Sequence, residues 1–254
     1  MRKWHKKAWL LVALFAALAT GCDFPGQPKP ADRPVRADQI ADFDQLYSNH
    51  CAGCHGADGK LGAAPPLNDP IFLAIVPDDE LQHVIAEGRS VTLSQRSPMP
   101  AFLVEKGGPL TGDQVKVLAQ GIKKRWAPSS VETKSLPSYL LPAEMNGACC
   151  DDTQLERGKK VFTEACAGCH GSHGQGGVKG HEHAGANSDP AFLALISDQA
   201  LRRIIITGRP DLGMPTFDGQ KGRPTDFHPL SSANIDDLTA LLAHWRQSPP
   251  GKDD

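Results

Sequence analysis

The strongest constraint on this chain is a six-residue sequence that it contains twice. CAGCHG occupies residues 51–56 and, letter for letter, residues 166–171. Longer stretches also match at a constant offset, residues 68–89 with 188–209 and 108–122 with 228–242. Self-similarity at a fixed spacing indicates homologous units in tandem. The chain is therefore expected to fold as two related repeats, each with one copy of CAGCHG.

Each repeat has the pattern of short amphipathic helices. Apolar side chains recur three and four residues apart in three segments of each repeat. The segments contain Ile40, Phe43, Leu46 and Tyr47 or Leu155, Val161 and Phe162; then Leu81, Val84 and Ile85 or Leu201, Ile204 and Ile205; then Val115, Leu118 and Ile122 or Ile235, Leu238 and Leu242. We expect Asp78 and Ser197 to cap the middle helices and Gly88 and Gly208 to end them. The pattern predicts an all-α fold.

The composition shows what such a fold would lack. Only 6% of the residues are aromatic, so two ordinary cores would be short of bulky side chains. Glycine and proline contribute 25 and 21 residues, which favours loops between short helices over a bundle of long ones. The formal charge of −2, without a basic run outside the N-terminus, argues against nucleic-acid binding. We expect a large apolar group to complete each core.

Each CAGCHG contains the pattern C-x-x-C-H, the signature of covalent haem attachment. Two thiols at this spacing can bond to the two vinyl groups of one porphyrin, and the adjacent imidazole can bind the iron. A structural zinc site would need a second pair of cysteines, and a thioredoxin-like redox pair would need a βαβ setting. The sequence therefore predicts two covalently bound haems c, on Cys51, Cys54 and His55 and on Cys166, Cys169 and His170.

A methionine in a similar local sequence follows each C-x-x-C-H. Met99 in SPMPAF and Met214 in GMPTF each lie 44 residues after the histidine of their repeat. A lone methionine usually fills a gap in a core, but Met99 and Met214 recur in the same local sequence of the two repeats. Met145 lies outside both repeats. We predict that Met99 and Met214 are the sixth iron ligands. With both axial positions filled, neither iron would have a place for substrate.

With these motifs, each repeat resembles a class I cytochrome c domain, and the chain resembles the dihaem cytochromes c with two such domains in tandem. The similarity extends from about residue 39 to 126 and from about 153 to 245. It implies crossed N- and C-terminal helices beside each haem, and electron transfer as the function. It also implies that a proline carbonyl in Ala64–Leu67 accepts a hydrogen bond from the axial histidine. The second repeat has no equivalent proline, so we expect His170 to lack this partner.

A second departure from the resembled family lies at Phe43. The family often has a small residue there, where the N- and C-terminal helices cross, and the equivalent residue of the second repeat is Gly158. We therefore expect a shifted helix contact in the first repeat.

The N-terminal residues are expected to lie outside both repeats. Residues 1–21 combine four basic residues with an apolar run, and LATGC at residues 18–22 resembles a bacterial lipobox. This pattern is typical of a lipoprotein signal peptide that is cleaved after Gly21, with a lipid on Cys22. An ordinary signal peptide is the alternative. Asp23 resembles a signal for retention at the inner membrane, and residues 22–36 read as a proline-rich tether. The predicted location is the periplasmic face of the inner membrane in a bacterial cell envelope.

The predicted domains are residues 37–127 and 151–248, joined by a connector at 128–150. Cys149 and Cys150 in the connector could form a vicinal disulfide, bridge two molecules or remain free.

Two further pairs of polar residues have open roles. Arg89 and Arg209 follow a glycine at equivalent positions, where they could contact haem propionates or lie in solvent. His181 and His183 could bind a metal, act as an alternative axial ligand or belong to an exposed glycine-rich loop.

Two classes of function fit these expectations. The first is a membrane-tethered electron carrier, not itself an enzyme, which could be a subunit of a membrane respiratory complex. It would link a quinol-oxidising complex or dehydrogenase to a terminal oxidase or soluble cytochrome. The second is a dihaem enzyme of the peroxidase type, which needs one haem with a labile sixth ligand. Met99 and Met214 favour the carrier. No segment of the sequence specifies its redox partners.

Overall fold

The computed structural model describes residues 29, 34–62, 64–89, 99–128, 136–145 and 151–251. These residues form helices and three isolated β-bridges, without a strand, so the predicted all-α fold is confirmed. Cys22, Cys149 and Cys150 lie outside the described residues, as do the predicted signal peptide and most of the tether. Within the described ranges, no helix has the length and apolar character to cross a membrane.

The chain divides into residues 1–39 and residues 40–254, and both copies of C-x-x-C-H lie in the second part. The 3₁₀ helices are η2 (Ala37–Gln39), η3 (Val104–Lys106), η5 (Ala143–Met145) and η6 (Pro210–Leu212). The first repeat contains α2 (Phe43–His50), α3 (Ala52–His55), α4 (Pro70–Ile75), α5 (Asp78–Glu87) and α6 (Gly112–Trp126). The second contains α7 (Asp152–Ala165), α8 (Ala167–His170), α9 (Pro190–Leu195), α10 (Asp198–Thr207) and α11 (Ser232–Trp245).

The caps of the middle helices differ from the expectation in one repeat. Ser197 caps α10 by accepting a hydrogen bond from the backbone N–H of Ala200. Asp78 does not cap α5, because Pro77 is the N-cap and Asp78 is the first helical residue. Its carboxylate instead pairs with Lys123 of α6. Gly88 and Gly208 end their helices, as predicted.

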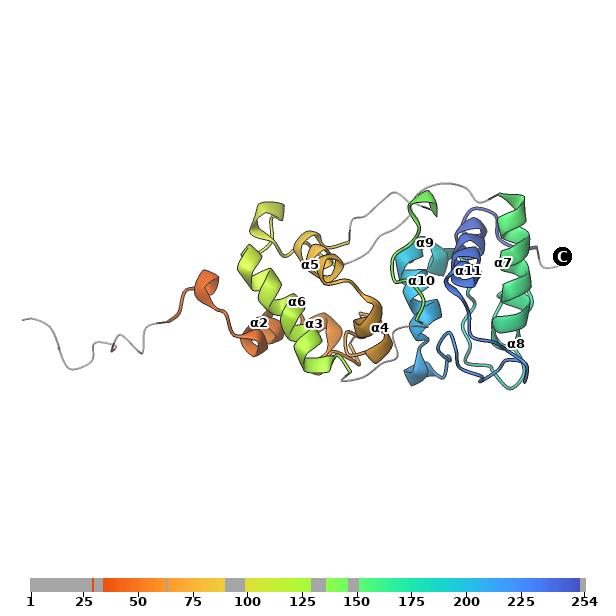
Figure 1. The fold of residues 1–254 in the computed structure, drawn as a ribbon, viewed down its shortest axis with the longest axis horizontal. Helices are drawn as coiled ribbons and strands as arrows, with labels where there is room; N and C mark the ends of the chain where they lie inside the picture. Colours follow the sequence, from red (N-terminus) through yellow and green to blue (C-terminus); the bar gives the residue numbers. More distant parts are fainter. Residues whose placement is uncertain are drawn as a thin grey trace, which may run out of the picture. The chain divides into compact units, whose positions relative to one another are not determined.

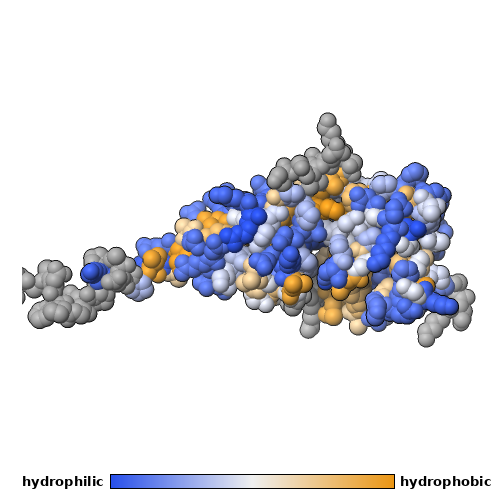
Figure 2. Space-filling model, turned by 90° about the horizontal axis from the view of Figure 1, so that it is seen from below, coloured by the Kyte–Doolittle hydropathy of each residue, from blue (hydrophilic) through white to orange (hydrophobic). Residues whose placement is uncertain are grey.

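Each repeat packs around its own apolar core. In the second repeat α7 lies beside α11 (Figure 1). Phe162 of α7 meets Trp245 of α11 edge to face, with 4.9 Å between the ring centroids. In the first repeat Tyr47 of α2 meets Trp126 of α6 in the same way at 5.2 Å. The surface in Figure 2 mixes hydrophilic residues, in blue, with scattered apolar ones, in orange.

The crossing of the terminal helices is built differently in the two repeats. In the second, Gly158 of α7 lies against α11: a Cβ there would be 2.5 Å from the carbonyl oxygen of Asp237 and 3.0 Å from Cβ of Leu241. In the first, Phe43 of α2 occupies the equivalent place and packs against Gly121 of α6, where a Cβ would be 2.0 Å from the ring. The glycine at the crossing thus belongs to the N-terminal helix in the second repeat and to the C-terminal helix in the first. The helix contact at Phe43 therefore differs from the family pattern, as expected.

Candidate haem sites

The two C-x-x-C-H segments have the same local structure. Each forms a single helical turn, α3 or α8, whose N-cap is the first cysteine. The backbone N–H of His55 donates to the carbonyl of Cys51 at 2.9 Å, and that of His170 donates to Cys166 at 2.9 Å. Residues three and four apart lie on one face of a helix, so each turn presents two thiols and one imidazole together.

The thiols of the two turns are not paired in disulfides, and the first thiol of each turn lies in a buried environment. All four cysteines of the two turns are free of disulfides. Burial, followed by the neighbouring Cys54, raises the pKa of Cys51 to about 12, and burial raises the pKa of Cys166 to about 12. Zinc binding and thiol–disulfide exchange both need thiolates, which these environments disfavour. No cluster of three His, Cys, Asp or Glu side chains in the described ranges could hold a metal ion.

Both histidines are oriented by a backbone carbonyl. Nδ1 of His55 lies 3.0 Å from the carbonyl oxygen of Pro65, and Nδ1 of His170 lies 2.8 Å from that of Gly185. A carbonyl can only accept, so Nδ1 carries the proton and Nε2 keeps its lone pair for a metal. The prediction that His170 lacks a partner was wrong. Any residue offers a backbone carbonyl, so the loop needs no proline to supply one.

The two methionines are held by equivalent backbone hydrogen bonds. The N–H of Arg89 donates to the carbonyl of Met99 at 3.1 Å, and the N–H of Arg209 donates to that of Met214 at 3.1 Å. Met99 is partly buried against the core of the first repeat, and Met214 is half-buried. Each methionine loop is thus attached to the end of the middle helix of its repeat.

Glycine permits this attachment in both repeats. Gly88 and Gly208 have φ angles of +69° and +64°, in the region that side-chain-bearing residues rarely adopt. A Cβ would lie 2.5 Å from the carbonyl oxygen of Met99 in the first case and 2.7 Å from that of Met214 in the second. The predicted helix stops therefore also let the methionine loop approach the helix end.

The side chains of the two equivalent arginines have different partners. Nη2 of Arg89 donates to the hydroxyl of Tyr139 at 3.3 Å. Arg209 instead binds both carboxylate oxygens of Asp211, at 2.9 and 2.7 Å, and this hydrogen bonding lowers the pKa of Asp211. Contacts of either arginine with haem propionates stay a prediction.

The predicted histidine pair lies in a loop of the second repeat. His181 forms an isolated antiparallel bridge with Val178, and its N–H donates to the carbonyl of that residue at 2.7 Å. His183 follows in the turn before Gly185, whose carbonyl faces His170. The loop that contains the pair therefore contributes to the candidate site through its backbone.

Sequence reasoning missed Arg223, which fixes a loop against the second C-x-x-C-H. Arg223 donates to the backbone carbonyls of Ala165, Thr216 and Gly219 at 3.1, 2.8 and 2.6 Å. The adjacent Gly222 lies so near α8 that a Cβ on it would be 2.4 Å from Sγ of Cys169. Five extra residues between the M-P and P-L dipeptides of the second repeat are the signal that marks this loop.

The donor types in both repeats fit a covalently attached haem. Each repeat offers two free thiols, an imidazole whose Nδ1 contacts a carbonyl oxygen, and a methionine whose backbone is bonded to a helix end. Thioether attachment consumes thiols, and axial ligation uses Nε2 and the methionine sulfur.

Comparison with known proteins gives matches to both repeats. Residues 155–245 match the family model described as "Cytochrome c", and residues 38–120 match "Cytochrome C oxidase, cbb3-type, subunit III". The chain is 28% identical over 199 residues to "Cbb3-type cytochrome c oxidase subunit FixPc" of Rhizobium leguminosarum bv. viciae, covering 77% of this chain and 60% of the relative. It is 31% identical over 153 residues to "Cbb3-type cytochrome c oxidase subunit CcoP" of Azospirillum sp. (strain B510), covering 58% and 44%.

Among solved structures, the chain is similar to a chain of the "Kuenenia stuttgartiensis reducing HAO-like protein complex Kustc0457/Kustc0458", at 16% identity and a TM-score of 0.43. That match covers 84% of this chain and 99% of the other. The chain spans three fifths or less of the length of the two curated relatives named above.

Proposed function

We propose that this chain, which carries two cytochrome c-type domains and with them two covalently bound haems c, transfers electrons in a respiratory chain. The observation that supports the proposal best is a repetition. Both C-x-x-C-H turns place their thiols on one helical turn and have a carbonyl on Nδ1 of the histidine. A carrier with two haems needs this arrangement twice.

The proposal assigns each donor to one haem. Cys51 and Cys54 would hold the first haem through thioether bonds, and His55 and Met99 would bind its iron. Cys166 and Cys169, with His170 and Met214, have these roles for the second haem. When bound, a haem iron supplies reversible one-electron oxidation and reduction, at a potential set by its ligands and surroundings.

The protein's own residues hold these ligands in place. The carbonyls of Pro65 and Gly185 fix the orientation of the imidazole rings and place a proton on Nδ1, so that Nε2 is the nitrogen available to a metal. The hydrogen bonds from the N–H groups of Arg89 and Arg209 hold the methionine loops at the helix ends. Two filled axial positions leave no site for substrate, which favours a carrier over an enzyme of the peroxidase type.

The names of the relatives point to the pathway. Both are named as subunits of cbb3-type cytochrome c oxidases. We infer that this chain accepts single electrons from a quinol-oxidising complex or a dehydrogenase and passes each one to a terminal oxidase or a soluble cytochrome. A lipid on Cys22 and a location at the periplasmic face of the inner membrane are parts of this proposal that derive from the sequence.

The test is the haem content of the full chain. We expect two haems per chain, both retained on a denaturing gel because thioether bonds survive unfolding. The variant Cys51→Ala/Cys54→Ala is expected to retain one haem, and so is Cys166→Ala/Cys169→Ala. Cys149→Ala/Cys150→Ala is the matched control and is expected to retain two. Extraction of all haem by acid acetone would contradict the assignment.

A further inference from the structure

Arg203 of α10 is a buried cation of the second repeat that contacts the first repeat. Only 9% of its surface is exposed. Its Nη2 donates to the carbonyl of Pro66, and its guanidinium carbon lies 3.5 Å from the centroid of the Phe72 ring. Pro66 directly follows Pro65, whose carbonyl accepts the hydrogen bond from Nδ1 of His55. Arg203 thus binds the carbonyl of the residue that directly follows Pro65, the hydrogen-bond partner of His55.

The charge of Arg203 has no close counterion. Burial lowers its pKa to about 10, so the side chain stays protonated at neutral pH. No carboxylate in the described part of the chain lies within ion-pair distance of its nitrogens. The carboxylate of Asp69 is near enough to favour the charged form, while Arg89 opposes it. The carboxylate of Asp69 already accepts the backbone N–H of Phe72 at the start of α4.

The neighbouring arginine on α10, Arg202, is also buried, but a carboxylate neutralises its charge. Arg202 is 1% exposed, pairs with Asp236 and donates to the carbonyl of Ser138 at 2.8 Å. The two adjacent arginines of α10 therefore differ in whether a carboxylate neutralises their charge. Arg202 is a paired charge within the second repeat and its connector, and Arg203 is an unpaired charge directed to the first.

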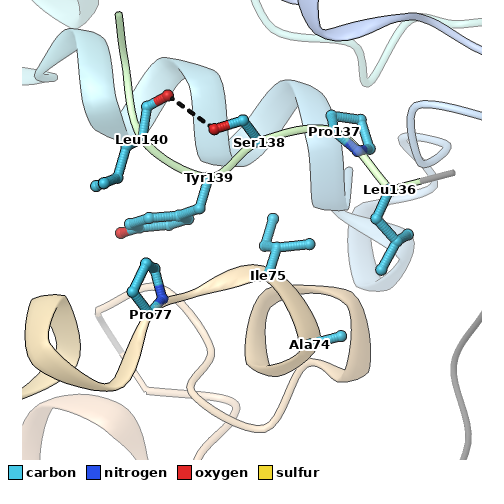
Figure 3. A pocket seen from close by; sticks show the side chains of 8 residues that line it. All are labelled: Ala74, Ile75, Pro77, Leu136, Pro137, Ser138, Tyr139 and Leu140. Atoms are coloured by element: carbon cyan, nitrogen blue, oxygen red, sulfur yellow. Dashed lines mark hydrogen bonds between the residues drawn. The ribbon is translucent and has the colours of Figure 1, made fainter. Parts of the chain in front are cut away.

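The connector covers the apolar side of this contact. Tyr139 is 3% exposed and packs on Phe72 with 5.7 Å between ring centroids. Figure 3 shows Tyr139 and Leu140 facing Ile75 and Pro77 around a pocket of about 230 Å³. A charge surrounded by aromatic rings and backbone is poorly screened by water, and its effect on nearby groups is correspondingly large.

We propose that Arg203 is a positioning residue for the first haem, which holds the Pro65–Pro66 segment against His55 and favours the reduced state of that haem. The inference rests on the haem assignment proposed above. An oxidised iron centre has one more positive charge than a reduced one, so an unpaired cation nearby destabilises the oxidised state more. At about 10 Å and an effective dielectric constant of about 20, a unit charge changes such an equilibrium by roughly tenfold.

The effect is expected in one repeat only. The residue of the first repeat that is equivalent to Arg203 is His83, which is exposed on α5. The carbonyl that faces His170 belongs to Gly185, in a loop of the second repeat itself. The two haems of one chain therefore serve as test and internal reference.

The experiment is a spectroelectrochemical titration of the full chain with both haems bound. Arg203→Met removes the charge, Arg203→Gln removes it but keeps a donor for Pro66, and Arg203→Lys keeps the charge. Met99→His moves the midpoint of the first haem and so assigns the two waves. At the wild-type midpoint of the first haem, we expect Arg203→Met and Arg203→Gln to raise the ratio of oxidised to reduced haem about tenfold. This change corresponds to a shift of the midpoint by about 59 mV to lower potential.

Arg203→Lys is expected to keep the first midpoint near its wild-type value, and the control His83→Gln to leave it unchanged. The midpoint of the second haem should stay constant in the three Arg203 variants and in His83→Gln, which also shows that these variants are folded. An unchanged first midpoint in both Arg203→Met and Arg203→Gln overturns the proposal, and so does an equal shift of both haems. Fewer than two haems in the wild-type chain would instead refute the proposed function.

Discussion

In the first repeat the carbonyl that faces His55 belongs to Pro65, and the next residue, Pro66, is bound by the buried Arg203. In the second repeat the carbonyl that faces His170 belongs to Gly185, in a glycine-rich loop. The distances from Nδ1 are 3.0 and 2.8 Å, so the two contacts are equivalent. Their surroundings are not. The comparison teaches that the hydrogen bond to a ligand is set by backbone geometry, while the sequence around it determines charge and access to water.

The helix crossings give a related lesson. Both repeats need one residue without a side chain where the terminal helices meet, and the chain supplies it from α7 in one repeat and from α6 in the other. The close approach is a property of the pair of helices. A motif search that expects the small residue on one particular helix finds it in the second repeat and misses it in the first.

The largest expected effect tests this exchange. Gly158→Leu places a side chain 2.5 Å from the backbone oxygen of Asp237, which cannot rotate away, so we expect a loss of about 3 kcal/mol in the free energy of unfolding. In the first repeat the obstacle to a Cβ on Gly121 is the ring of Phe43, which can be removed. The variant Phe43→Ala/Gly121→Ala should therefore lose less than the sum of its single substitutions.

Urea unfolding followed by circular dichroism measures these changes. Gly112→Ala is the matched control, because a Cβ there has no neighbour within 4 Å. We expect its stability to stay within about 0.5 kcal/mol of the wild type. Equal losses for Gly158→Leu and Gly112→Ala would show that the crossing does not require a glycine.

The next effect is a difference between the two haem potentials. The glycine-rich loop at Gly185 should admit water, which stabilises the charge of an oxidised centre, whereas Arg203 opposes that charge in the first repeat. We therefore expect the second haem to have the lower midpoint, by about 59 mV or more, which is a tenfold difference in equilibrium constant. A single Nernst wave in the wild-type titration contradicts the inequality, and a higher midpoint for the second haem contradicts its sign.

The smallest expected effect concerns the caps of the middle helices. Ser197→Ala removes a hydrogen bond to the N–H of Ala200 and should cost about 1 kcal/mol. Asp78→Ala removes an ion pair with Lys123 in which the carboxylate is 74% exposed, and it should cost about 0.5 kcal/mol or less. Thermal unfolding of the two variants compares them directly. A larger loss in Asp78→Ala would show that this carboxylate stabilises α5 after all.

The parts that the sequence predicted are those fixed by neighbours along the chain. The all-α fold, the Ser197 cap and the ends of α5 and α10 follow from local patterns. Asp78 was misjudged because a proline before it takes the N-cap position and a lysine from another helix takes its carboxylate. Arg203 had no signal at all, because its partners lie 137 and 131 positions away, at Pro66 and Phe72.

The hydrogen bonds from the N–H groups of Arg89 and Arg209 to the methionine carbonyls have a kinetic consequence. Each bond joins two backbone atoms, so it persists whatever side chain stands at the arginine position. Under the proposed iron ligation, we expect Met99 or Met214 to leave its haem only after this bond opens. Amide hydrogen exchange at Arg89 and Arg209 therefore reports how often each haem pocket opens, and the two rates can be compared within one molecule.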